Sequence, residues 1–231
     1  MAIRKTQLQR PARALMPLVL GAACALWSSL CPADIPGYPS SIEAYDSREV
    51  AMLPRYCIHT QLFREHVPGG GNAAEIGRWR AMMGETFDSL HHYCWGLMKI
   101  NRGTILARSQ QDRLHYLTDS IREFDYVIER APPDFVLLPE ILTRRGETLV
   151  KLGRATQGIA DLQQAIEAKP DYWPPYAALS DHYKSVGETA KARELLEKAM
   201  SFAPESTGLK RRLAELGGGI AKARPAPKPA P

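Results

Sequence analysis

The sequence of 231 residues contains none of the short motifs that mark common catalytic or cofactor sites. It has no Gly-x-Ser-x-Gly nucleophile turn, no His-Glu-x-x-His zinc pair and no Cys-x-x-Cys-His haem attachment site. The glycine run at residues 69–71 is not followed by Lys and Ser or Thr, so it is no phosphate-binding loop. These absences predict a protein that is not an enzyme and needs no cofactor. The alternative is a hydrolase or transferase site of unrecognised type in the N-terminal region.

A strong charge of one sign is also missing. Lys and Arg together number 30 against 25 Asp and Glu, which leaves a net charge of only +5. Four of the basic residues lie in the first 13 positions and three lie after residue 220. Because the excess sits at the two ends rather than in one folded patch, the sequence predicts no nucleic-acid partner.

Long apolar runs are limited to one, at residues 14–27. Four positive charges precede it and small residues follow, with Ala33 suited to be the last residue before cleavage, which is the pattern of an export signal. Pro17 and Gly21 interrupt the run, and it is short for a membrane span. Residues 1–33 are therefore predicted to be a signal peptide, or else a signal anchor that holds the protein at the inner membrane. Either outcome predicts a periplasmic location.

Cysteine is scarce. Of the four cysteines, Cys24 and Cys31 leave with a cleaved signal, so that Cys57 and Cys94 remain. A single remaining pair in an exported chain predicts a disulfide, and the alternative is two buried free thiols.

Histidines near these cysteines raise a second possibility. His59, His91 and His92 are residues of metal-ligand type, and His91 lies one helical turn from Cys94. Their spacing matches no structural zinc pattern, so no metal is predicted. The alternative function is a metal- or redox-linked periplasmic protein that uses Cys57, His59, His91 or His92, and Cys94.

A period of 34 residues is the strongest positive signal in the chain. It relates the two segments that start near Leu142 and near Tyr176, and the matching residues are Leu142 and Tyr176, Leu149 and Tyr183, Gly153 and Gly187, Leu162 and Leu196, Ala165 and Ala199, and Pro170 and Pro204. Such a period predicts helix–turn–helix units that must stack to bury their apolar faces. The two segments closely resemble the tetratricopeptide repeat family. Gly158 stands where that family usually has Ala, a departure expected only to lower helix propensity.

The rest of the chain is also predicted to be helical. Helices are expected at about residues 53–66, 75–101, 109–131 and 206–216, and the third of these begins with a capping box at Ser109 and Asp112. The second and third helices are interpreted as a divergent first repeat, and the last one as a capping helix. The predicted fold is thus an all-α solenoid of helix–turn–helix units with an N-terminal helical extension. Its predicted parts are residues 34–110 for the N-terminal helical region, 111–217 for the solenoid and 218–231 for an extended, disordered Pro/Ala-rich tail.

The resemblance implies where a partner would bind. In the family, the first helix of each unit lines an inner groove, and the matching positions here are Glu140, Thr143, Glu147, Val150, Lys151, Ala177, Asp181 and Lys184. Glu147 and Asp181 would repel a carboxylate, so the groove is expected to accept a basic or mixed peptide. The predicted function is an exported scaffold or adaptor for a protein or peptide partner, acting as an accessory or assembly factor of an envelope or secretion system.

Overall fold

The computed structural model describes residues 45–217, which belong to a single compact unit of the chain. The predicted signal, the residues up to 44 and the C-terminal tail lie outside the described part. Every regular element between residues 45 and 217 is helical, as predicted. The elements are α1 (Ser47–Ala51), η2 (Arg55–His59), α2 (Phe63–His66), α3 (Ala73–Met83), η3 (Gly84–Ser89), α4 (Leu90–Asn101), the π-helical turn η4 (Arg102–Leu106), α5 (Gln110–Ile128), α6 (Leu138–Lys151), α7 (Ala155–Ala168), α8 (Pro174–Ser185), α9 (Thr189–Phe202) and α10 (Thr207–Glu215).

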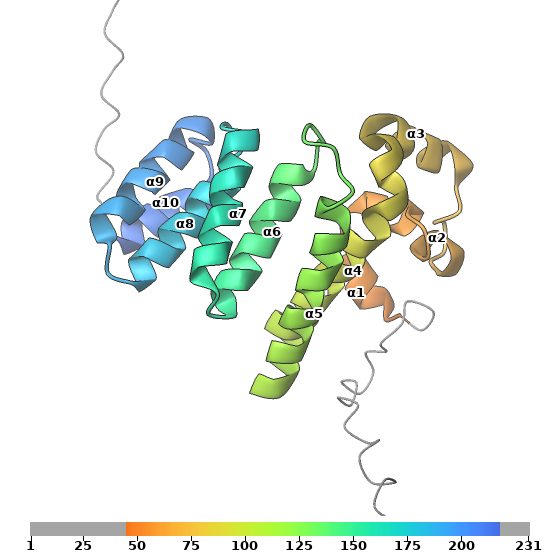
Figure 1. The fold of residues 1–231 in the computed structure, drawn as a ribbon, viewed down its shortest axis with the longest axis horizontal. Coiled ribbons are helices and arrows are strands. Elements are labelled where there is room, and N and C mark those ends of the chain that lie inside the picture. The colour runs from red at the N-terminus through yellow and green to blue at the C-terminus, as the bar shows by residue number, and fades with distance from the viewer. Residues whose placement is uncertain (1–44, 218–231) are drawn as a thin grey trace, which may run out of the picture. The chain divides into compact units, whose positions relative to one another are not determined.

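Successive helices pack as pairs: α4 with α5, α6 with α7, and α8 with α9 (Figure 1). Each pair also contacts the next, through α5 and α6 and through α7 and α8, and α10 closes the series against α9. The pairing of α4 with α5 spans residue 110, where the sequence suggested a boundary. None of the helices in the described region is long and apolar enough to cross a membrane.

The turns within the two regular units depend on glycine. Gly153 follows α6 with φ at +79°, and Gly187 follows α8 with φ at +85°. L-residues with a side chain rarely adopt this conformation, whereas glycine does so at little cost. Both glycines therefore provide the left-handed turn that follows the first helix of each unit.

The two helices of each unit approach closely at one point. In the first unit, a Cβ atom on Gly158 would lie only 2.5 Å from the carbonyl oxygen of Gly146. The equivalent residues of the second unit are Ser180 and Ala192, and there the Ser180 hydroxyl donates a hydrogen bond of 2.8 Å to the Ala192 carbonyl. Gly158 was expected to lower helix propensity without changing the repeat assignment. The structure adds a second effect, because the backbone of α6 leaves no room for a side chain there.

An arginine joins three helices around the first regular unit. Arg145 on α6 forms ion pairs with Asp161 on α7 at 2.7 Å and with Asp125 on α5 at 2.6 Å. Burial is the largest single influence on the pKa of Arg145 and lowers it. The hydrogen bonds and negative charges of Asp161 and Asp125 together outweigh burial, so the pKa of Arg145 is raised. The divergent pair and the first regular unit are thus linked by charge as well as by apolar packing.

The N-terminal helices are shorter than expected. The predicted helix at 53–66 is divided into η2 and α2, because Leu62 takes a φ of +68° between them. The predicted helix at 75–101 is divided at Gly84, whose φ of +64° ends α3 before η3 and α4. Met83, Phe87 and Leu90 are spaced three or four residues apart along this segment, and all three are nevertheless buried. The capping box at Ser109 and Asp112 is confirmed at the start of α5.

A pair of glycine substitutions tests the close approach. Gly158→Ala should lower the free energy of unfolding by about 1–3 kcal/mol, because the new methyl group overlaps the α6 backbone. Gly77→Ala is the control, since no atom lies within 4 Å of its Cβ position inside α3, and it should raise stability by about 0.4–1 kcal/mol. Urea unfolding of the full chain measures both. Equal effects of the two substitutions would contradict the proposed backbone contact.

Candidate functional site

The predicted groove positions divide into accessible and buried residues. Thr143 and Ala177 have only 2% and 3% of their surface exposed, so their side chains take part in helix packing. Val150 is half-buried against α7, where its Cγ2 atom lies 2.7 Å from the Cβ position of Gly158. Glu140 and Glu147 are partly exposed, and Lys151 is exposed. The accessible part of the predicted groove in the first unit therefore consists of the charged residues Glu140, Glu147 and Lys151 of α6.

The charges predicted for the second unit are neutralised by α10. Asp181 forms an ion pair of 3.0 Å with Arg212, and Lys184 forms one of 2.8 Å with Glu215. The hydrogen bond from Lys184 lowers the pKa of Glu215. Asp181 therefore does not present the uncompensated negative charge on which the expected repulsion of a carboxylate depended.

Glu140 is partly accessible and, unlike Asp181, has no cation from residues 45–217 within ion-pair distance. In the part of the chain described, it forms no ion pair, and its carboxylate accepts one hydrogen bond, from the Tyr93 hydroxyl at 2.7 Å. By contrast, Glu147 lies 3.6 Å from the guanidinium of Arg144 on the same helix. Glu140 thus retains acceptor capacity for a group from outside.

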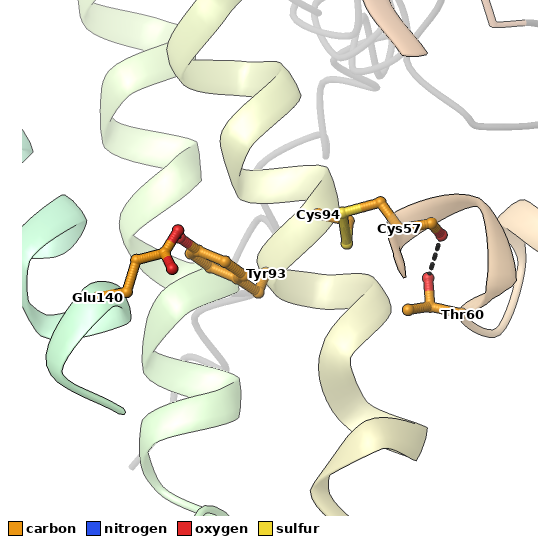
Figure 2. Close-up of a disulfide and its surroundings, with 5 residues drawn as sticks. All are labelled: Cys57, Thr60, Tyr93, Cys94 and Glu140. Atoms are coloured by element: carbon orange, nitrogen blue, oxygen red, sulfur yellow. Dashed lines mark hydrogen bonds between the residues drawn. A yellow bond between two sulfur atoms is a disulfide. The ribbon is translucent and has the colours of Figure 1, made fainter. Parts of the chain in front are cut away.

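Helix α4 connects this site to the N-terminal region. Figure 2 shows Tyr93 pointing from α4 toward Glu140 of α6, while its neighbour Cys94 points toward Cys57 of η2. In the structure, Cys57 and Cys94 form a disulfide whose Cα atoms are 5.6 Å apart. The Thr60 hydroxyl donates a hydrogen bond of 2.7 Å to the Cys57 carbonyl. Two adjacent residues of α4 therefore make both contacts: Tyr93 donates to Glu140 of α6, and Cys94 is bonded to Cys57, which precedes α2.

A second anchor lies just upstream. Glu49 of α1 and Arg102 of η4 form a fully buried ion pair, with hydrogen bonds of 2.6 and 2.9 Å. Residues 52–54 lie between this ion pair and the disulfide, so both ends of the segment are fixed. We call Met52, Leu53 and Pro54 the wall segment.

The wall segment forms one side of a hollow of about 270 Å³. The hollow opens beside Glu140, and its lining comprises the wall segment, Leu97, Ile100 and Asn101 of α4, and Glu140 and Arg144 of α6. Met52 is 45% exposed there. Sequence reasoning missed the wall segment because it lies outside the repeats and was expected to begin a regular helix. The signal available in the sequence was Cys57, three residues after Pro54, because a disulfide at that position would hold residues 52–54 close to α4.

Three tyrosines lie around Glu140 and Arg144. Burial, reinforced by the negative charge of Glu140, raises the pKa of the Tyr93 and Tyr56 hydroxyls and raises that of Tyr172 to about 12. All three therefore remain neutral donors at physiological pH. The Tyr56 hydroxyl is buried and finds no hydrogen-bond partner among residues 45–217.

The candidate metal ligands do not come together. His59 uses Nδ1 in a hydrogen bond of 2.9 Å with the Gly70 carbonyl, while Nδ1 of His92 lies 2.6 Å from the Glu123 carboxylate. The His91 ring lies 4.3 Å from that of His92 between centroids, and burial lowers the pKa of His91. Across the described residues, no three side chains of His, Cys, Asp or Glu are arranged to hold a metal ion. The metal-linked alternative thus receives no geometric support.

Comparison with known proteins identifies the repeats. The model of the tetratricopeptide repeat family matches residues 139–172, which hold α6, α7 and the turn before α8. The match covers one unit of the chain. A curated relative is the Hsp70-Hsp90 organizing protein of Triticum aestivum, 31% identical over 92 residues, which are 40% of this chain but only 15% of that protein. A solved tetratricopeptide repeat protein from Thermus thermophilus is 19% identical, with a TM-score of 0.50 over 67% of this chain and 87% of that one. This last likeness supports the fold alone.

Two tyrosine substitutions test the arrangement around Glu140. Tyr93→Phe removes a hydrogen bond to a carboxylate and should lower the free energy of unfolding by about 1.5–3 kcal/mol. Tyr56→Phe removes a buried hydroxyl without a partner, so stability should stay unchanged or rise by up to about 2 kcal/mol. Denaturant unfolding of the full chain provides the measurement. A loss of equal size in both variants would show that the Tyr56 hydroxyl has a partner in solution.

Proposed function

We propose that this protein is an exported scaffold that binds a protein or peptide segment along the groove face of α6. The observation that carries the proposal is the accessible carboxylate of Glu140 beside the hollow, on the helix face where the repeat family places its ligands. Tetratricopeptide repeats are generally non-catalytic scaffolds for protein partners, which agrees with the absence of catalytic motifs from the sequence.

The proposed partner segment is basic or of mixed charge. Glu140 and Glu147 supply two negative charges to this face of α6, and Arg144 and Lys151 supply two positive charges. Complementary charges increase the association rate and disfavour acidic competitors. The name of the wheat relative describes a protein that organizes two others, and a comparable role for this chain is an accessory or assembly factor.

The proposed setting is the periplasm, in an envelope or secretion system. The basic, apolar and small-residue pattern of residues 1–33 supports export, and an uncleaved signal would keep the protein at the inner membrane. In that oxidising compartment we expect Cys57 and Cys94 to be bridged.

Charge reversal tests the groove. The full chain carrying Glu140→Lys and Glu147→Lys should lose the partners that the unaltered protein captures from an envelope extract, because a face of balanced charge becomes strongly basic. The matched control carries Glu167→Lys and Glu194→Lys, two exposed changes of the same charge on α7 and α9. Quantitative mass spectrometry compares the captured proteins. Identical capture by both double variants would rule out the α6 face as the binding surface.

Thiol counting tests export and the bridge together. Protein recovered from the periplasm of a Gram-negative host should contain no free thiol after denaturation. Reduction should lower the free energy of unfolding by about 3–4 kcal/mol, because 37 residues separate the two cysteines. Failure to reach the periplasm would contradict export. In protein whose signal has been removed, and with it Cys24 and Cys31, two free thiols would contradict the bridge, and stoichiometric metal alongside them would favour the metal-linked alternative.

A further inference from the structure

The hollow beside Glu140 has the size and lining of a site for one side chain. Five of its eight lining residues are apolar, and its volume of about 270 Å³ lies just below the range of about 300–1,000 Å³ usual for small-molecule pockets. The polar groups of Asn101, Glu140 and Arg144 share the remainder of the lining. Polar and apolar groups contribute equally to its surface, so the hollow can accept an apolar side chain that has a polar neighbour.

Glu140 is the charged group beside the hollow that could bind a residue of the partner, because it forms no ion pair within the described residues. Arg144 lies one helical turn from Glu140 and lines the same hollow; although burial opposes it, the charges of both Glu147 and Glu140 raise the pKa of Arg144. The acid and base predicted for the second unit are paired with α10. The Glu140 carboxylate receives only the neutral hydroxyl of Tyr93 within the described chain. Arg144 is not within ion-pair distance of Glu140, so a Lys or Arg side chain of a partner would supply the direct contact that this carboxylate lacks.

The site is also fixed before a partner arrives. The wall segment is held upstream by the buried pair of Glu49 and Arg102 and downstream by the bond between Cys57 and Cys94. A site that needs no ordering on binding loses less free energy when it is occupied.

From these observations we infer that the groove selects an extended partner segment in which an aliphatic residue stands next to Lys or Arg. The aliphatic side chain enters the hollow against the wall segment, and the adjacent cation binds the Glu140 carboxylate. The inference rests on the proposed function, and it names the class of segment that the groove accepts.

The probe is the blocked peptide acetyl-Ser-Gly-Leu-Lys-Gly-Ser-amide, titrated into the full chain with selectively labelled methyl groups. Methyl resonances of Leu97 and Ile100 should shift as the peptide binds. Replacing Leu by Ser, or Lys by Glu, in the peptide should weaken binding at least about tenfold, because each change removes one of the two contacts.

Protein variants test the two contacts separately. Met52→Glu should weaken binding of the Leu-Lys peptide at least about tenfold by placing a charge at the hollow, whereas Met82→Glu alters an exposed methionine on α3 and should have no effect. Glu140→Gln should reduce the preference for Lys over Glu in the peptide, and the control Glu129→Gln, at the end of α5, should preserve it.

The outcomes separate this inference from the proposed function. A Leu-Lys peptide that shifts no methyl group at the hollow at millimolar concentration would overturn the inference, while partner capture that depends on Glu140 and Glu147 would leave the groove proposal standing. Equal binding of the Lys and Glu peptides, or equal effects of Met52→Glu and Met82→Glu, would also overturn it. Loss of charge-dependent capture would overturn the proposed function itself.

Discussion

The fold depends on how closely the two helices of each repeat approach one another. At Gly146 and Gly158 the backbones of α6 and α7 nearly touch, and at Ser180 and Ala192 a hydroxyl bridges the same gap between α8 and α9. Close approach lets Leu142, Leu162 and Leu196 lose almost all contact with water. Each of these side chains contributes about 1.5–3 kcal/mol when buried, so the apolar interface between helices stabilises the whole series.

The same packing creates the candidate site. Because α6 is fixed against α7, its opposite face carries Glu140 in a defined position, where Tyr93 of α4 reaches it. Helix α4 then connects the repeats to the N-terminal region through Cys94, and the wall segment is held beside α6 as a result. The candidate site therefore combines Glu140 of α6 with the wall segment, which lies outside the residues matched by the repeat model.

The sequence predicted what depends on periodic, local signals. The 34-residue period, the glycine turns at Gly153 and Gly187 and the capping box at Ser109 require only short-range rules, and the structure has all of them. The breaks at Leu62 and Gly84 were missed, because a helical apolar stripe can continue across an irregular turn. Long-range contacts were also out of reach. Nothing local to Asp181 indicates Arg212, and nothing local to Glu49 indicates Arg102.

Native-state hydrogen exchange of the full chain tests the nested helix pairs most directly. If α6 and α7 shield each other, their slowest amides should exchange with the same free energy of opening and the same dependence on denaturant, because neither helix is stable alone. The pair α8 and α9 should behave likewise. Exchange of α7 at a much lower free energy than α6, with no response of one helix to opening of the other, would contradict the account.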